Sequence, residues 1–249
     1  MRQLETLDLR KSFGGIRALD GVSIAVDKGS VVSIVGPNGA GKTTLFKCIA
    51  GYYKPDGGKI LLKGEEVQGK RPPELVRRGV SVTFQVPRPF RGLSVLENIL
   101  AAIGSPSYSG ARFLRRVSMD DYERARIIAE TMGLERFLEM DASLLPLGLQ
   151  KRLEIAKALA MEPELIMLDE PTAGMSREEA RDVARIIEKL RDEGITVMLI
   201  EHNVPFAVSV SDYMYVLNYG KVLSSGIPRE VIRDQRVVEA YLGRGYTVS

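Results

Sequence analysis

Alternating apolar and polar stretches predict strands and helices in turn along the first third of the chain. Residues 4–35 carry short β-type segments separated by glycine turns, and residues 31–35 are apolar almost throughout. A nearly continuous apolar run is typical of a strand that is covered on both faces. Helical spacing follows at residues 43–50, and strand character returns at residues 59–63 and 80–84. We therefore expect strand, loop, helix and strand in succession.

Helical periodicity dominates the middle of the chain. Apolar residues recur at helical spacing over residues 94–102, 119–132 and 150–161, which predicts a helical subdomain. Residues 104–118 mix Gly, Ser and Pro with several arginines, and this composition indicates an exposed loop with some helix at its end.

Strand and helix signals alternate again towards the end of the chain. Strands are predicted at residues 165–168, 196–200 and 213–217, with a helix around residues 177–193 and helical character at residues 228–242. Strands that alternate with helices indicate a largely parallel sheet with helices on both faces.

Composition narrows the class of protein. The chain has 249 residues, 45% of them hydrophobic and 27% charged, which fits one composite globular domain. A net charge of +3 gives little support to a broad nucleic-acid-binding face. The single cysteine, Cys48, excludes an internal disulfide, and no apolar run reaches membrane-spanning length. The N-terminus has no signal core, so we expect a cytoplasmic chain that acts on membranes only through a partner.

A phosphate-binding loop follows the apolar strand at residues 31–35. The motif G-x4-G-K-[ST] is matched by Gly36, Pro37, Asn38, Gly39, Ala40, Gly41, Lys42 and Thr43. Glycines let backbone N–H groups approach phosphates, and the next helix offers the positive end of its dipole. Lys42 would neutralise the β and γ phosphates, and Thr43 would coordinate Mg²⁺. The alternative is a chance match, which the strand and helix on either side disfavour.

Two carboxylates end the predicted strand at residues 165–168. Asp169 can hold Mg²⁺ through water against the phosphates, and Glu170 can orient and deprotonate the attacking water. A carboxylate at this position favours hydrolysis over the phosphate transfer of a nucleotide kinase. A merely solvated strand end is the alternative for the pair.

These residues carry a resemblance to a known family. The loop at residues 36–44, the run Leu-Asp-Glu-Pro-Thr-Ala-Gly at residues 168–174 and Ile-Glu-His at residues 200–202 resemble ABC-type ATPases. More narrowly, the chain resembles the ATPase subunits of branched-chain amino acid importers at residues 13–19, 83–85 and 237–243. Related cassettes for urea, amides and lipopolysaccharide share parts of this pattern.

The resemblance implies an α/β P-loop NTPase fold in a single ABC ATPase domain. A mostly parallel core, an antiparallel β subdomain and an inserted helical subdomain are expected. The nucleotide-binding core would span residues 1–85 and 162–225, the helical subdomain residues 86–161 and a C-terminal helical segment residues 226–249.

The resemblance also assigns roles to individual residues. It implies that Phe13 stacks on adenine, that Thr44 belongs to the nucleotide loop, and that Gln85 contacts Mg²⁺ or the attacking water. His202, the only histidine, would contact the γ-phosphate as a switch. With Lys42, the catalytic set is then Glu170, His202 and Gln85. The alternatives are a core phenylalanine, a surface amide and a structural histidine.

One motif departs from the family. The Leu-Ser-Gly-Gly-Gln signature aligns with Leu145 and then with Pro146, Leu147, Gly148 and Leu149. In the family this segment closes over ATP bound to the other subunit. Proline supplies neither a hydroxyl nor an amide hydrogen, so the site that this signature completes should be weakened, although Gly148 and the helix expected from about residue 150 remain. Ser176 also stands where the family has aspartate. These departures favour a heterodimer with unequal ATP sites, with a homodimer as the alternative.

The resemblance thus implies an ATPase that powers an ABC transporter, with import of branched-chain or other amino acids expected. Its expected partners are a second ATPase subunit, permease subunits and, indirectly, an extracytoplasmic binding protein, at the cytoplasmic face of the membrane. No nucleic-acid partner is expected. Residues 85–97 are the candidate groove for a permease helix, with an ordinary loop as the alternative, and the exposed residues expected there are Pro87, Arg88, Pro89, Phe90 and Arg91.

Two other functions stay open. A soluble ABC ATPase acting on ribosomes or DNA would usually carry two cassettes, a long coiled coil or a zinc hook, and the sequence shows none of these. A small-molecule kinase is disfavoured by Glu170 and His202.

Overall fold

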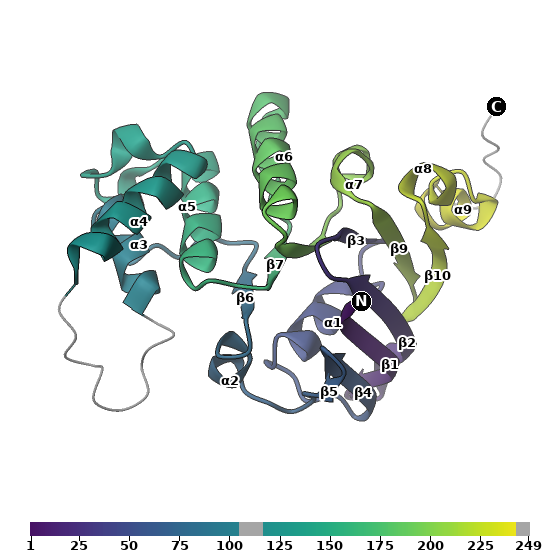
Figure 1. The fold of residues 1–249 in the computed structure, drawn as a ribbon. Coiled ribbons are helices and arrows are strands. Elements are labelled where there is room, and N and C mark those ends of the chain that lie inside the picture. The colour runs from purple at the N-terminus through teal and green to yellow at the C-terminus, as the bar shows by residue number, and fades with distance from the viewer. Residues whose placement is uncertain (105–116, 243–249) are drawn as a thin grey trace.

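The computed structural model describes residues 1–104 and 117–242, which form two sheets and surrounding helices (Figure 1). The larger sheet has the strand order β10-β9-β3-β8-β7-β6. Its strands are β3 (Val31–Val35), β6 (Val80–Thr83), β7 (Leu165–Asp169), β8 (Thr196–Ile200), β9 (Tyr213–Asn218) and β10 (Lys221–Gly226). Neighbouring strands are parallel except β10, which pairs antiparallel with β9. The predicted α/β fold with a mostly parallel core is confirmed.

The smaller sheet is antiparallel, with the strand order β2-β1-β4-β5. It contains β1 (Arg2–Phe13), β2 (Ile16–Asp27), β4 (Gly57–Leu62) and β5 (Glu65–Glu66). The prediction of short segments over residues 4–35 is wrong here, because β1 and β2 form one long hairpin. Register shifts along this pair interrupt the apolar alternation, so each long strand looks like several short ones in the sequence.

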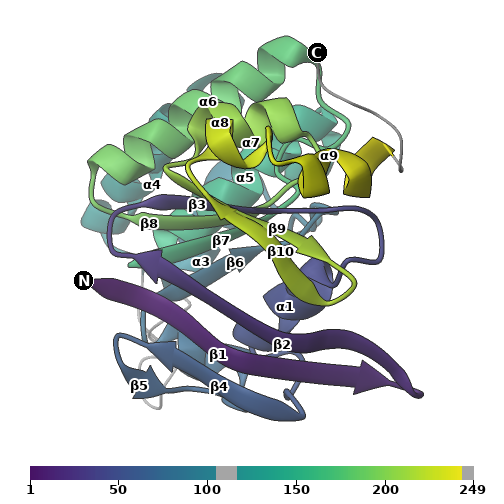
Figure 2. The same cartoon turned by 90° about the vertical axis from the view of Figure 1, so that its right-hand side faces the viewer.

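Apolar cores cover both faces of the larger sheet. Helix α1 (Lys42–Ile49) lies between the two sheets (Figure 2). On β7, Leu165 and Met167 belong to the core around α1, whereas Ile166 and Leu168 belong to the core beneath the helices of the opposite face. Burial on both faces explains why these strands are continuously apolar.

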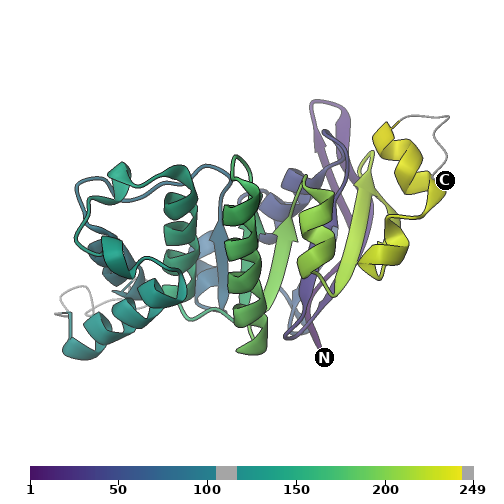
Figure 3. The ribbon, with the colours of Figure 1, turned by 90° about the horizontal axis from the view of Figure 1, so that it is seen from above.

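The remaining helices form three groups. A helical group of α3 (Val95–Gly104), α4 (Met119–Thr131) and α5 (Leu147–Ala160) stands to one side of the sheets (Figure 1), with the short 3-10 turns Glu135–Phe137 and Ala142–Leu144. Helices α6 (Arg177–Asp192) and α7 (Val204–Val210) come next, followed by α8 (Pro228–Val231) and α9 (Gln235–Leu242) at the far side (Figure 3). A short α2 (Pro72–Val76) precedes β6. No helix in the described part of the chain is long and apolar enough to cross a membrane.

Two helix predictions need correction, and one loop prediction lies mostly outside the described residues. Helix α5 begins at Leu147 rather than near residue 150, because the extended backbone of Pro146 fits an N-cap position. The helix predicted over residues 228–242 is two short helices, since Asp234 accepts a hydrogen bond from the Arg236 N–H and starts α9 separately. Most of the loop predicted over residues 104–118 lies outside the described residues, as do residues 243–249.

Candidate active site

The candidate site lies where parallel strands end at one edge of the larger sheet. Ile34 of β3 pairs with Ile200 of β8, and Ile200 pairs with Asp169 of β7. Thr83, the last residue of β6, pairs with Leu168. Because these strands are parallel, the chain leaves all of them at the same edge, where open α/β sheets bind ligands. The register therefore gathers segments that are far apart in sequence.

Two glycines of the phosphate loop are required by close contacts. A Cβ on Gly36 would lie 2.1 Å from the carbonyl oxygen of Leu217, and one on Gly41 would lie 2.4 Å from that of Ala18. Both glycines also have positive φ angles, 149° and 104°. A larger residue at either position would push the loop away from the strands that hold it.

Lys42 is buried inside the loop that it ends. Its Nζ donates to the carbonyl oxygens of Gly36 at 2.7 Å and Pro37 at 3.0 Å, and only 4% of the residue is exposed. Burial lowers its pKa, whereas the charges of Glu170 and Asp169 act in the opposite direction. The ammonium is thus held in place by the loop backbone on which phosphates would sit.

A cavity of about 290 Å³ opens over this loop. Its lining residues are Ala18, Asn38, Gly39, Ala40, Gly41, Lys42, Thr43, Thr44 and His202. The structure therefore brings the loop and the histidine together, as the resemblance implied. Ala18 was not foreseen as a lining residue, because its place depends on the approach of β2 to the loop.

Glu170 is held by two side chains from neighbouring strand ends. Its Oε2 accepts a hydrogen bond from Gln85 Nε2 at 2.7 Å, and its Oε1 lies 2.7 Å from His202 Nε2. Asp169 precedes it with 6% of its surface exposed, and burial, assisted by the charge of Glu170, raises the pKa of Asp169 to about 6. All four acidic, amide and imidazole groups predicted for the site therefore meet at one sheet edge.

The donor set suits Mg²⁺. Thr43 offers a hydroxyl, Gln85 an amide oxygen and Asp169 a carboxylate, and Mg²⁺ prefers hard oxygen ligands. Among the described residues no group of three or more His, Cys, Asp or Glu side chains could hold a metal ion. Because Mg²⁺ beside a nucleotide is usually held by one or two carboxylates plus phosphates and waters, such a small protein share is the expected one.

Glu201 was missed by the sequence analysis as a separate functional residue. It is 2% exposed, and its Oε1 accepts hydrogen bonds from the N–H and the hydroxyl of Thr172. Its Oε2 accepts from the N–H groups of His202 and Asn203. This carboxylate links the loop after β7 to the loop after β8 and so fixes the position of the His202 backbone. An acidic residue directly after an almost wholly apolar strand was the available signal.

Lys151 of α5 was also missed. Its Nζ donates to the carbonyl oxygen of Glu170 at 2.7 Å, and 5% of the residue is exposed. It shares the buried side of the helix with Ile155 and Ala158, four and seven residues later. A lysine on an apolar helical stripe was the signal that could have found it.

Phe13 lies at the tip of the β1–β2 hairpin, and it does not line the cavity over the loop. Its ring packs edge-on against Tyr53 with centroids 5.2 Å apart, and Lys11 Nζ lies 5.3 Å from the ring centroid. The ring is 42% exposed. Its role in adenine stacking stays a prediction.

The altered signature forms the first turn of α5. Pro146 caps the helix without a side-chain hydrogen bond, and its carbonyl accepts from the Gln150 N–H. Leu147 is 47% exposed, whereas Gly148 is buried, and a Cβ at position 148 would lie 2.4 Å from Glu179 Oε1. The first N–H groups of an α-helix have no partner within the helix. Because α5 begins three residues earlier than predicted, these N–H groups belong to the signature itself.

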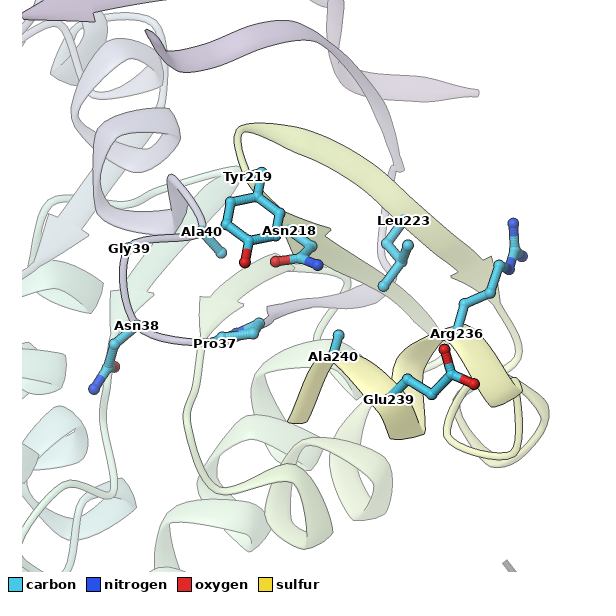
Figure 4. Close-up of a pocket in the computed structure, with 10 residues that line it drawn as sticks. All are labelled: Pro37, Asn38, Gly39, Ala40, Asn218, Tyr219, Leu223, Arg236, Glu239 and Ala240. Atoms are coloured by element: carbon cyan, nitrogen blue, oxygen red, sulfur yellow. The ribbon is translucent and has the colours of Figure 1, made fainter. Parts of the chain in front are cut away.

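A second cavity, of about 690 Å³, separates the phosphate loop from the C-terminal helix (Figure 4). Pro37 and Asn38 line one side, and Glu239 and Ala240 of α9 line the other. Burial raises the pKa of Tyr241 to about 12, and the nearby backbone of Gly36 acts in the opposite direction. The C-terminal segment thus lies beside the loop, which its sequence did not reveal.

A third cavity, of about 580 Å³, lies beside the segment that follows β6. It is lined by Pro87, Arg88, Pro89, Phe90, Arg91, Ser143 and Gln150. Of the residues expected to be exposed there, the arginines and Phe90 are exposed and the two prolines are only half-exposed. Buried Asn98 fixes the segment, since it accepts from the Phe90 N–H at 2.7 Å and donates back to the Phe90 carbonyl.

Two family models match the sequence. One described as ABC transporter matches residues 19–173, and one described as branched-chain amino acid ATP-binding cassette transporter matches residues 221–247. The chain is 40% identical over 250 residues to the high-affinity branched-chain amino acid transport ATP-binding protein BraF of Pseudomonas aeruginosa, covering 96% of this chain and 97% of that protein. It is 36% identical over 252 residues to the probable branched-chain amino acid transport ATP-binding protein LivG of Methanocaldococcus jannaschii, covering 98% of each.

Solved structures agree with the sequence comparisons. A nucleotide-free ATP-binding cassette from an ABC transporter superposes with a TM-score of 0.88 at 35% identity, over 98% of this chain and 100% of that chain. The ADP conformation of an ATP-binding cassette of an ABC transporter gives the same score, identity and coverage.

Proposed function

The chain belongs to the ABC transporter family, and we propose that it is the cassette that powers import of branched-chain amino acids. As a member of this family it binds ATP and hydrolyses it. The observation that carries the proposed chemistry is the contact of Glu170 with both Gln85 and His202 at the edge of the phosphate loop. The cargo is proposed from the relatives, which are named for branched-chain amino acid transport.

The loop and Lys42 bind the phosphates. Backbone N–H groups of residues 38–43 surround the β-phosphate, and the ammonium that now contacts Gly36 and Pro37 neutralises the β and γ phosphates. Mg²⁺, held by Thr43, Gln85 and Asp169, would supply further charge neutralisation. Phe13 at the tip of the hairpin stacks on adenine. The nucleotide is thereby oriented with its γ-phosphate towards β7.

Glu170 acts on the attacking water. Each oxygen of this carboxylate has one side-chain contact, Oε2 with Gln85 and Oε1 with His202, and each keeps a second acceptor position. An attacking water can therefore donate to Glu170 while these two side chains hold the carboxylate in place. With the nucleotide bound, Gln85 would be placed to contact Mg²⁺ and His202 to contact the γ-phosphate.

The third cavity is the proposed docking groove for a permease helix. Phe90 is 49% exposed beside two arginines, and aromatic and arginine side chains are enriched at interfaces. Asn98 and Lys157 hold the segment, because Lys157 Nζ donates to the Arg88 carbonyl and lies 4.7 Å from the Phe90 ring centroid. A held segment transmits force better than a loose loop. Docking there would place the chain at the cytoplasmic face of the membrane.

A heterodimer fits the two half-sites of this chain. Its own phosphate loop, Asp169 and Glu170 are complete, whereas Pro146 brings no donor to the ATP of the other subunit. We therefore propose a partner cassette with a better signature, which completes the site built on Glu170.

Affinity purification with ATP present tests the proposal. Tagged Glu170→Gln should stay in the closed dimer because it binds ATP without hydrolysing it. From detergent-solubilised native membranes, mass spectrometry should then identify a multi-spanning permease and a different cassette chain. Glu164→Gln is the matched control, since Glu164 pairs with Lys63 outside the site and this variant should hydrolyse ATP normally.

Three outcomes would contradict parts of the proposal. Recovery of ribosomal or DNA-repair proteins alone would favour a soluble ATPase, and recovery of this cassette chain alone with the permease would favour a homodimer. Uptake of labelled leucine should be lost in Glu170→Gln cells and kept in Glu164→Gln cells. Unchanged leucine uptake in Glu170→Gln cells would assign another cargo.

A further inference from the structure

The buried ammonium of Lys151 has no role in the chemistry described above. A lysine is almost never fully buried unless it is paired. Lys151 is 5% exposed, and its Nζ donates to a backbone atom, the carbonyl oxygen of Glu170 at 2.7 Å. The hydrogen bond to Glu170 therefore offsets the loss of hydration of the Lys151 ammonium, and Glu170 is the residue that carries the proposed base.

The backbone of Glu170 needs such support. Its φ angle is 49°, in the left-handed region that costs a non-glycine residue about 1 kcal/mol or more. On one side, its N–H donates to the Ile200 carbonyl at 2.9 Å. On the other side, its carbonyl accepts from Lys151. These two contacts fix the peptide from which the Glu170 carboxylate projects towards Gln85 and His202.

The charge of Lys151 also matters at this place. Burial lowers its pKa, while the carboxylates of Glu201, Glu170 and Asp169 favour its charged form. The ammonium is thus the buried cation from α5 among three acidic groups at the ends of β7 and β8. A neutral side chain could fill the space but would not balance these charges.

We propose that Lys151 is a positioning residue that couples the first turn of α5 to the catalytic carboxylate of the same chain. This inference rests on the proposed function, because it takes Glu170 as the base and the start of α5 as the segment that meets ATP on the partner cassette. Gly148 and Lys151 lie one turn apart on one rigid helix. When the start of α5 meets a γ-phosphate on the partner cassette, the helix moves, and Lys151 passes this movement to the Glu170 peptide. Occupancy of one ATP site therefore controls the position of the catalytic carboxylate at the other site.

Kinetics of the assembled transporter test this coupling. Hydrolysis should report mainly on the Glu170 site, since the site completed by Pro146 is the weaker one. Lys151→Met fills the same space without a donor or a charge, and kcat should fall by about 10- to 100-fold, the cost of a small misplacement of a catalytic group. The KM for ATP should change by less than about threefold, because the phosphate loop is untouched.

Two further variants separate positioning from packing. Lys151→Arg keeps the charge and the donors and should restore most of kcat, and Lys151→Gln, which keeps a donor only, should be intermediate. Lys189→Met is the control, since Lys189 also joins two separate elements by a hydrogen bond, from α6 to Thr131 of α4, but does not touch the acidic groups of the site. Lys151→Gln and Lys151→Arg carry the test alone if Lys151→Met does not assemble.

The overturning results are specific. Wild-type kcat in Lys151→Met, with Glu170→Gln inactive, would remove the coupling and leave the proposed function intact. Equal losses in Lys151→Met and Lys151→Arg, with equally lowered melting temperatures, would reduce Lys151 to a structural residue. Active Glu170→Gln would instead remove the proposed base, whatever the Lys151 variants do.

Discussion

The buried carboxylate of Asp169 makes the stability of the fold depend on pH. Its pKa is raised from 3.8 to about 6, chiefly by burial. Between these two values the folded chain binds more protons than the unfolded chain, so the contribution of Asp169 becomes less favourable as pH rises through this window. Well above pH 6, the buried charge of Asp169 lowers the free energy of unfolding by roughly 3 kcal/mol.

We therefore expect Asp169→Asn to raise the free energy of unfolding in the absence of nucleotide and Mg²⁺. The gain should be up to roughly 3 kcal/mol near pH 7.5 and about half of that near pH 5. Urea unfolding at the two pH values measures it. Mg²⁺-dependent ATP binding should fall in the same variant, and an identical gain at both pH values would contradict the burial explanation.

Close contact, rather than backbone conformation alone, requires glycine at position 36. In Gly36→Ala the new methyl would lie 2.1 Å from the Leu217 carbonyl oxygen, so β9 or the loop has to move. We expect a loss of about 3 kcal/mol or more in unfolding free energy, together with loss of ATP binding. Thermal unfolding and titration with a fluorescent ATP analogue check both effects.

Gly39→Ala is the matched control for that substitution. Gly39 has a φ angle of 79°, but nothing lies within 4 Å of a Cβ placed there. The variant should lose only about 1 kcal/mol, the cost of the left-handed conformation. Equal losses in Gly36→Ala and Gly39→Ala would show that conformation, and not contact with β9, sets the requirement.

At the level of single residues, the sequence identified the groups that belong to compact motifs. The phosphate loop, Asp169 and Glu170 were found because they occupy neighbouring positions after apolar strands. Glu201 and Lys151 were not, since their importance comes from burial and from partners in other segments. The hydrogen bonds that link Glu170 to Gln85 likewise depend on strand register, which single-residue patterns do not contain.

At the scale of elements, the structure gives Ser176 a role that the family comparison did not suggest. Its hydroxyl accepts from the Glu179 N–H, and the Glu179 carboxylate accepts from the Ser176 N–H, so the pair caps α6. Ser176→Ala should therefore lower the unfolding free energy by about 1 kcal/mol, and Ser176→Asp should leave it nearly unchanged because aspartate caps equally well.

Urea unfolding measures this prediction, with Ser118→Ala as its control. Ser118 and Asp121 form the same arrangement at the start of α4, away from the ATP site, so the loss should be similar there. A loss confined to Ser176→Ala, or a large loss in Ser176→Asp, would show that position 176 does more than cap the helix.

Elements with one clear period were predicted well, and those shaped by tertiary contacts were not. The strand predicted at residues 31–35 coincides with β3, because burial on both faces leaves a continuous apolar run. The start of α5 was missed, since its first turn contains a glycine and its cap is a proline, two residues that disfavour a helix interior. The hairpin of β1 and β2 was divided in the prediction because its register shifts break the alternation.

At the scale of the whole molecule, the chain offers one complete half-site and one altered half-site. The loop, Asp169 and Glu170 lie at the edge of the large sheet, whereas the altered signature lies at the start of α5 in the helical group (Figure 1). Two copies of this chain would give two equal sites, each with the altered signature. A partner with a donor at the serine position would give one strong and one weak site, and this difference can be measured.

Pro146→Ser with Leu147→Gly should strengthen the weak site. Serine restores a hydroxyl and an N–H for the γ-phosphate and a side-chain cap for α5, and glycine removes a leucine that is 47% exposed where the partner's nucleotide would lie. One restored donor is worth orders of magnitude at its own site, so total hydrolysis by the assembled transporter should rise by about twofold as a second site joins the first.

Leu144→Ala controls for loss of apolar surface, since Leu144 is 71% exposed just before the signature and offers no donor. Its hydrolysis rate should stay that of the wild type. A much larger rise in the double variant would mean that no site was fully active before, as a homodimer requires. An unchanged rate would mean that Pro146 does not limit hydrolysis at the second site. Any difference between the two ATP sites would then have to come from residues of the partner subunit.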